Sequence, residues 1–150
     1  MSENVKVVAQ NRKARHEYFI LERYEAGLVL TGTEIKSIHQ GKVNLAEAYI
    51  RITSGEAFIL GMHIGFYEQG NQFNHVETRT RKLLLNKREI RKLQKATQLE
   101  GHTIVPLRLY LKRGLAKIEI AEAKGKKLYD KRQSQKERDV KRQLQKATRK

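Results

Sequence analysis

Alternating apolar and polar positions recur along the chain and predict short β-strands. The pattern covers residues 16–23, 28–30, 48–53, 56–62, 103–112 and 116–120. Ser54 and Gly55 have the composition of a tight hairpin turn, and so do Arg113 and Gly114. Pro106 lies inside a strand and cannot donate a hydrogen bond to a neighbour, so it predicts an edge or a bulge. The side chains expected to point inward from that strand are Val105, Leu107, Leu109 and Leu111.

The first helix is predicted to open at Thr31. Thr31 and Glu34 have the spacing of a capping box, in which each side chain satisfies a free backbone donor of the other residue. Ile35 and Ile38 form its expected buried side. Gly41 can end it in a left-handed conformation.

The second helix is predicted to open at Asn86, with Glu89 three residues later, and to run to about Gln98. Ile90 and Leu93 mark its buried side. The other side carries the cations Lys87, Arg88, Arg91, Lys92 and Lys95. This face is either a platform for phosphates or an ordinary solvated helix face.

Three segments show no regular alternation or helical period of apolar positions. Residues 1–10 are expected to form a loose arm, and 25–27 a turn into the short strand that follows. Residues 65–77 contain two glycines and predict a long loop. Its aromatic residues either stack on bases or cap the end of the fold: Phe66, Tyr67 and Phe73.

These elements predict a mainly β fold with short helices. The specific expectation is an OB-fold-like closed antiparallel β-barrel with two or three peripheral helices. The expected division is a flexible arm over 1–10, a barrel domain over 11–123 and a basic tail over 124–150.

The net charge of the chain predicts an anionic binding partner. The 150 residues carry a net charge of +16, and residues 124–150 hold 12 Lys or Arg against 3 acidic residues. This tail has too few apolar side chains to offset its ordering entropy, so alone it is expected to be mobile, and helical against a polyanion. A simple solubility tail is the alternative. Nucleic acid is the first expected partner and an anionic membrane surface the second.

The composition limits the cell compartment and the chemistry. The chain has no cysteine, no secretory signal and no apolar run near the roughly 20 residues of a membrane span, so a cytoplasmic protein is expected. No nucleotide-binding loop or nucleophile elbow is present. We expect neither an enzyme nor a metal or cofactor, because the histidines lack ligand spacing: His16, His39, His63, His75 and His102.

Five blocks of sequence resemble the SmpB family, the SsrA-binding proteins of bacterial trans-translation. They are NRKARHEYFI (11–20), EAGLVLTGTEIKS (25–37), GEAFILG (55–61), TRTRKLLLNKREI (78–90) and AKGKKLYDKR (123–132). The resemblance implies an oligonucleotide-binding barrel that binds the tRNA-like domain of transfer-messenger RNA (tmRNA). It also implies entry into the vacant A site of stalled ribosomes, with alanyl-tmRNA and elongation factor Tu, by a protein that is monomeric in solution.

The resemblance also assigns roles to individual residues. Asn11, Glu25 and Leu84 match the family's RNA-binding face, near the basic residues Arg79, Arg81 and Lys82. His16 and Tyr18 match a second surface, which faces the decoding centre of the small subunit. The family's tail motif, implied to lie as a helix in the empty mRNA channel, is matched by Gly125, Lys126, Lys127, Tyr129, Asp130, Lys131 and Arg132.

Two other functions compete with this one. A general ribosome-associated or single-stranded-RNA-binding protein would show affinity that follows charge, with little preference among RNAs. An RNA hydrolase is disfavoured, because no acid–base pair or metal-ligand set is evident in the sequence.

Overall fold

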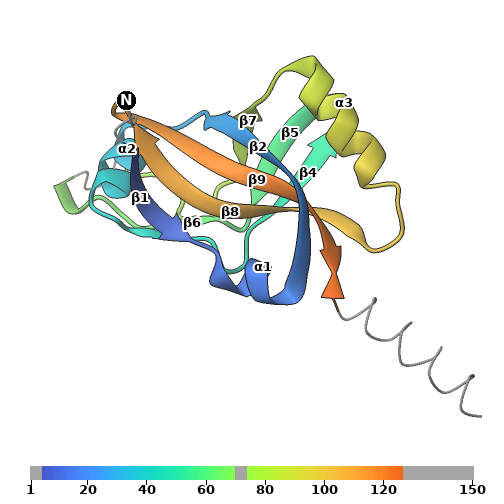
Figure 1. The fold of residues 1–150 in the computed structure, drawn as a ribbon. Coiled ribbons are helices and arrows are strands. Elements are labelled where there is room, and N and C mark those ends of the chain that lie inside the picture. Colours follow the sequence, from blue (N-terminus) through green and yellow to red (C-terminus); the bar gives the residue numbers. More distant parts are fainter. Residues whose placement is uncertain (1–4, 70–73, 127–150) are drawn as a thin grey trace, which may run out of the picture.

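A computed structural model describes residues 5–69 and 74–126 of the chain. Two sheets and three helices form one body around a shared core (Figure 1). The predicted tail residues from Lys127 onward and Phe73 lie outside the described residues.

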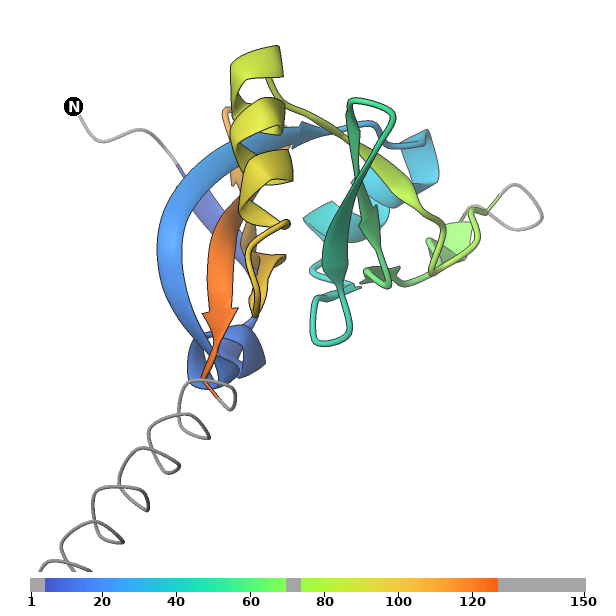
Figure 2. The same ribbon diagram turned by 90° about the vertical axis from the view of Figure 1, so that its right-hand side faces the viewer.

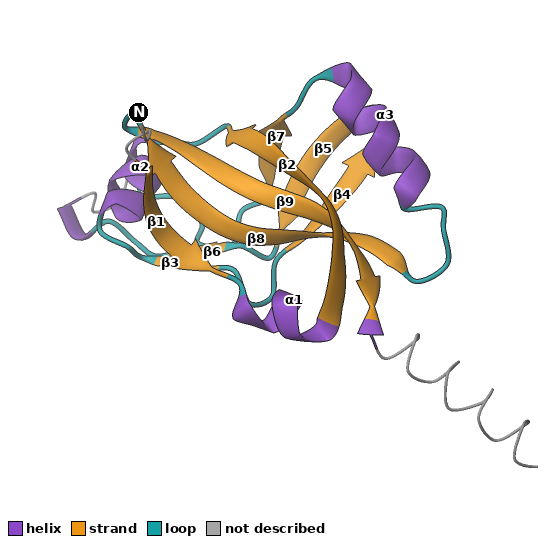
Figure 3. Ribbon diagram, in the orientation of Figure 1, coloured by secondary structure: helices purple, strands orange, loops and turns teal. Residues whose placement is uncertain are grey.

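The main sheet has seven antiparallel strands in the order β1-β8-β9-β2-β7-β5-β4 (Figure 3). Their bounds are β1 (Val5–Gln10), β2 (Tyr18–Leu28), β4 (Tyr49–Thr53), β5 (Glu56–Leu60), β7 (Arg81–Leu84), β8 (His102–Lys112) and β9 (Leu115–Gly125). A second sheet pairs β3 (Val43–Asn44) with β6 (His63–Ile64). The mainly β class with short helices is confirmed.

The closed barrel is wrong, because neither sheet closes on itself. The edge strands of the main sheet are β1 and β4, and no ladder joins them within the described residues. The sheet curves strongly around the core (Figure 2). At the gap, β1 packs against β3 of the small sheet, and β4 packs against β8.

The arm predicted over 1–10 is wrong for Val5–Gln10, which forms β1 and pairs with the second half of β8. Next comes a helix that the pattern did not predict, α1 (Arg12–Glu17), with Asn11 as its N-cap. The strand expected from residue 16 therefore begins at Tyr18. No turn occurs at 25–27, because β2 continues through these residues as the partner of β9.

Both predicted capping boxes are present. They open α2 (Gly32–His39) at Thr31 and α3 (Lys87–Ala96) at Asn86. Gly41 has a φ of +76°, as the predicted left-handed ending requires. Helix α3 ends at Ala96, two residues earlier than predicted.

The helices bury less of the predicted apolar side than expected. Ile38 and Leu93 are fully buried in the main core. The prediction that Ile35 is a core residue is wrong, because 41% of its surface is exposed. Ile90 is only half-buried.

A bulge in β8 divides its buried side chains between two clusters. The register shifts between Pro106 and Arg108, as the proline predicted. Because one extra residue reverses which face a side chain points to, Leu109 and Leu111 enter the main core. Leu107 packs instead in a smaller cluster under α1. The single inward face expected for this strand is therefore wrong.

Both predicted hairpin turns are confirmed. Ser54 and Gly55 have φ values of +52° and +74°, and Arg113 and Gly114 have +53° and +78°. Two successive positive φ values are typical of the tight turn whose twist matches that of a hairpin. The second turn places the β8–β9 hairpin tip at one end of the molecule (Figure 1).

Candidate RNA-binding surface

A polar cluster lies on the outer face of the sheet, centred on Glu25 of β2. The Tyr110 hydroxyl of β8 donates a hydrogen bond to the Glu25 carboxylate, and Lys112 Nζ lies 3.5 Å from Glu25 Oε2. Burial, with the nearby Glu25 carboxylate, raises the pKa of Tyr110 above its ordinary value. The phenol therefore remains a proton donor, and it holds the carboxylate in one orientation.

A second charged cluster adjoins the first on the same face. Glu119 of β9 lies 3.7 Å from an Arg23 nitrogen and 3.6 Å from an Arg108 nitrogen. The Arg108 guanidinium also lies over the Tyr110 ring, 4.8 Å from its centroid. Planar arginine groups held in this way are suited to phosphates and to stacking on bases.

An apolar groove of about 300 Å³ continues this face toward β7. Leu84 and Leu115 are 53% and 62% exposed beside it, although both are large apolar side chains. Gly27 pairs with Leu84, and a Cβ at Gly27 would lie only 3.3 Å from Leu84 Cβ. The glycine therefore leaves room for Leu84 to lie against β2.

A second hollow, of about 290 Å³, shares Leu115 and Lys117 with the groove and also contains Glu25, Lys112 and Arg113. The two hollows therefore form one continuous face. We call it the Glu25 surface and define it by the residues Glu25, Leu84, Lys112, Leu115 and Lys117; Tyr110, which holds the Glu25 carboxylate, is buried.

The three basic residues predicted near this face have different environments. Lys82 is exposed, with its Nζ 3.2 Å from a Glu56 oxygen. Arg79 is partly exposed, and its Nη2 lies 2.6 Å from Glu34 Oε1. Arg81 is fully buried, so in this conformation its side chain has no surface to offer to RNA. The alternation of β7 could have shown this, since Arg81 shares the phase of the buried Leu83.

Arg81 is instead the centre of a buried network. Its guanidinium donates to the fully buried Glu34 carboxylate and to the carbonyls of Met62, at 2.7 Å, and Glu77, at 3.0 Å. Burial raises the pKa of Glu34, but hydrogen bonds from Arg79, the Thr31 N–H and Arg81 lower it by more. Glu34 therefore remains ionised and joins α2 to β7.

Asn11 also lies inside the fold, with 4% of its surface exposed. Its side chain accepts a hydrogen bond from the Ala14 N–H at 3.1 Å and donates one to the Pro106 carbonyl at 2.9 Å. It joins the start of α1 to the bulge of β8. The structure therefore places Asn11 and Arg81 in the scaffold, and Glu25, Lys82 and Leu84 at the surface.

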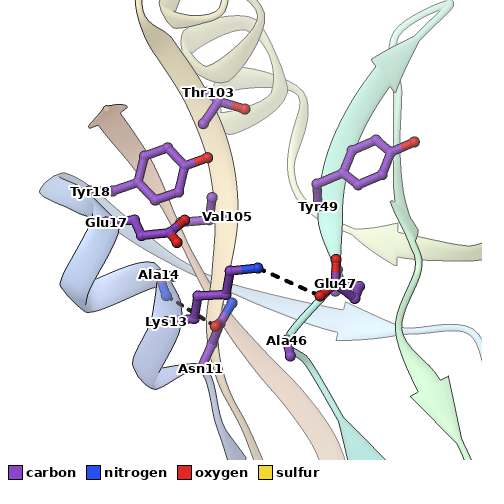
Figure 4. Close-up of a pocket in the computed structure, with 11 residues that line it drawn as sticks. Asn11, Lys13, Ala14, Glu17, Tyr18, Ala46, Glu47, Tyr49, Thr103 and Val105 are labelled. Carbon is purple, nitrogen blue, oxygen red and sulfur yellow. Dashed lines mark hydrogen bonds and ion pairs between the residues drawn. The ribbon is translucent and has the colours of Figure 1, made fainter. Parts of the chain in front are cut away.

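A third hollow lies at the opposite end of β8, beside α1 (Figure 4). It has a volume of about 360 Å³, and Tyr18 and Tyr49 line it from opposite sides. Lys13 Nζ lies 3.6 Å from a Glu47 oxygen across the opening. His16 is exposed near the end of α1.

The start of the tail emerges at this same end. Strand β9 continues to Gly125, which pairs with Tyr18 of β2. Lys126 Nζ donates to the Arg15 carbonyl at 3.4 Å and lies 5.4 Å from the centroid of the Phe19 ring. The structure thus gathers four predicted residues at one end: His16, Tyr18, Gly125 and Lys126. Five others lie outside the described residues: Lys127, Tyr129, Asp130, Lys131 and Arg132.

Residues 5–69 and 74–126 contain no group of three or more His, Cys, Asp or Glu side chains placed to hold a metal ion. Within the same ranges, no helix is long and apolar enough to cross a membrane. The Glu25 surface also includes residues that the sequence did not single out, namely Lys112, Leu115 and Lys117, and its carboxylate is held by the buried Tyr110. The three surface side chains alternate with buried ones along β8 and β9. Which of them share an outer face with Glu25 follows only from the register that pairs these strands with β2.

Comparisons with known proteins show the family of this chain. The family model described as SmpB protein matches residues 8–150. The SsrA-binding proteins of Geobacillus thermodenitrificans (strain NG80-2) and Bacillus cereus (strain B4264) are 57% and 58% identical over 144 residues, covering 96% of this chain and 93% of each relative. A solved structure described as "tmRNA-SmpB: a journey to the center of the bacterial ribosome" aligns with a TM-score of 0.67 and 44% identity, covering 78% of this chain and 82% of that chain. The chain therefore belongs to the SmpB family.

Proposed function

We propose that this chain binds tmRNA through the Glu25 surface and brings it to stalled ribosomes for trans-translation. The observation that carries the proposal is the composition of that surface. It combines an oriented carboxylate, exposed leucines and several cations on one continuous face. The family relatives are SsrA-binding proteins, and the matched solved structure concerns tmRNA-SmpB and the bacterial ribosome.

Each part of the Glu25 surface has a role in RNA recognition. Lys112 and Lys117 are placed to neutralise phosphates, which supplies affinity and makes binding sensitive to salt. The oriented Glu25 carboxylate accepts hydrogen bonds from 2′-hydroxyl groups or base amines, which bulk charge cannot do. Leu84 and Leu115 pack against unstacked bases or sugars. A carboxylate at the centre of a basic face favours RNA of one shape over polyanions in general.

The opposite end supplies the ribosomal contact in this proposal. His16, Tyr18 and the start of the tail lie together there, away from the β8–β9 hairpin tip. The protein would then hold tmRNA with one end while the other faces the decoding centre and the mRNA channel. Under this proposal, the protein acts in the cytoplasm, as a binding factor without catalytic activity of its own.

A competition assay tests RNA selectivity. Full-length protein would be titrated with cognate tmRNA at fixed, near-physiological salt, with excess bulk tRNA and single-stranded RNA as competitors. We expect tmRNA binding to persist in the presence of both. Equal competition by all three RNAs would favour a general basic RNA-binding protein and would refute the proposal.

Removal of the tail tests the division of labour. Because β9 continues to Gly125, a cut after Lys126 preserves the sheet, whereas a cut before Lys124 would remove ladder residues. The protein cut after Lys126 should bind tmRNA nearly as well as the full chain and should fail to support tagging on stalled ribosomes. A large loss of tmRNA affinity would show that the body is not the tmRNA-binding unit.

A further inference from the structure

The outward face of α3 is almost entirely cationic. Leu93 and Ala96 supply its buried side. The exposed side chains that carry positive charge are Lys87, Arg88, Arg91, Lys92 and Lys95. No large apolar side chain lies among them, since Ile90 is half-buried. The face therefore lacks the aromatic or apolar anchor that a protein partner needs, and it is complementary in charge to a polyanion.

The electrostatics of α3 oppose its own stability. Lys87 and Arg91, and likewise Arg91 and Lys95, are like charges four residues apart, a spacing that destabilises a helix. Lys87 and Arg88 occupy the first turn, where the positive end of the helix dipole disfavours cations. Such repulsion within a folded element points to a function outside the fold.

Little within the described residues compensates this charge. The acidic residue of α3, Glu89, accepts from the Asn86 N–H at 3.2 Å as part of the cap. The ion pair that α3 makes in the described part of the chain joins Lys92 to Glu22, with 3.9 Å between the charged atoms and both side chains more than half exposed. A contact of this kind contributes little, because water screens it.

Helix α3 follows β7, the strand that carries Leu84 of the Glu25 surface. Leu84 lies opposite Gly27 at the end of β7, and three residues later the chain enters α3. Lys92 reaches Glu22 of β2, three residues before Glu25, and by strand alternation Glu22 points to the opposite face from Glu25, so the α3 cations and the Glu25 surface lie on the two sides of the same strand. Its 10 residues span about 15 Å, which is the axial length of about four phosphates on one strand of a duplex.

We propose that the exposed cations of α3 bind backbone phosphates of the same tmRNA that the Glu25 surface recognises. The inference rests on the proposed function. The Glu25 surface provides the selective contacts, and α3 holds another part of the backbone as a second, sequence-independent contact. The repulsion stored in the free helix is relieved when phosphates lie against it.

The test removes three charges from α3 without removing its buried side. The variant K87Q/R91Q/K95Q would be compared with K6Q/K36Q/R51Q, which removes three exposed cations from β1, α2 and β4. Equilibrium binding of tmRNA would be measured at several salt concentrations, together with thermal unfolding of each free protein. Each lost phosphate contact lowers the log–log salt slope by about 0.9, or about fivefold in affinity at 0.15 M salt.

For the α3 variant we expect a loss of about a hundredfold in tmRNA affinity, a shallower salt slope, and a Tm equal to or above that of the wild type. The matched control should lose less than fivefold. Equal losses of tmRNA affinity in the two variants would mean that only the net charge of the protein matters, and would overturn the inference. Unchanged tmRNA binding by the α3 variant would also overturn it, even if ribosome binding fell, because α3 would then serve another RNA. A wild type without preference for tmRNA would instead refute the proposed function, and this inference with it.

Discussion

Replacement of Glu34 by glutamine tests the buried network that joins α2 to β7. Glutamine can still accept the Thr31 N–H in the capping box. It cannot neutralise Arg81, which is fully buried and donates to Glu34 through Nε. The change therefore removes one charge and leaves the cap geometry in place.

The expected loss follows from the burial of the pair. Both Glu34 and Arg81 have no exposed surface, and removal of one partner from such a pair costs about 3–5 kcal/mol. For a body of this size, that corresponds to a fall in Tm of about 12–20 °C. Glu56→Gln is the matched control, because the Glu56–Lys82 pair is about half exposed and such pairs contribute about 0–1 kcal/mol.

The difference in unfolding free energy between the wild type and the E34Q variant should become smaller as the pH falls. The network lowers the pKa of Glu34, so its contribution is present above the unfolded pKa of about 4.3 and is lost as the pH falls toward the lower folded value. The E34Q variant has no carboxylate at this position to protonate. The gap between the wild type and the variant should therefore be constant near neutral pH and narrow below about pH 4.

Urea unfolding at pH 7 and at a series of acidic pH values would measure both quantities. A loss below 1 kcal/mol at pH 7, or a gap that does not narrow in acid, would refute the reasoning. The first result would mean that water reaches Arg81, and the second that Glu34 is not the ionised partner.

Three further predictions concern single side chains. Gly61→Ala should lower the unfolding free energy by about 1–3 kcal/mol, because Gly61 has a φ of +75° and a Cβ there would lie 2.5 Å from the Glu47 carbonyl oxygen; an unchanged urea midpoint would contradict this. Tyr110→Phe should lower the unfolding free energy by about 1 kcal/mol at pH 7. Because the pKa of Tyr110 is raised in the folded state, the wild type should lose stability as the pH rises above about 10, and the variant should not show this loss. Parallel curves of unfolding free energy against alkaline pH for the two proteins would contradict this. Leu84→Ser should weaken tmRNA binding by about fivefold or more in a filter or anisotropy assay while Tm hardly changes, because 53% of Leu84 is exposed; a fall in Tm with intact binding would assign Leu84 to the core.

The features that the sequence predicted well depend on residues near one another. The capping boxes at Thr31 and Asn86 need a donor and an acceptor three residues apart, and both formed as expected. The tight turn at Ser54 is set by two adjacent residues in the same way. Such interactions do not depend on where the rest of the chain lies.

The features that the sequence missed depend on distant partners. Val5–Gln10 has no strong alternation of its own and becomes a strand because β8 offers an edge with which to pair. The bulge after Pro106 then reverses which side of β8 faces the main core. Arg81 looked like part of a basic surface run because Glu34, its partner, lies 47 residues away. Sequence spacing could not reveal that this cation neutralises a buried acid.

The register of β9 has a mechanical consequence. This strand of 11 residues is paired on both sides, with β8 and β2, up to the point where the tail begins. Its ladder hydrogen bonds lie across the strand, so a pull on the tail along the strand direction loads many of them at once in shear and does not peel them apart one by one. The body is thus built to resist traction applied through its C-terminal end, and tension in the tail would be transmitted to the whole sheet before any strand detaches.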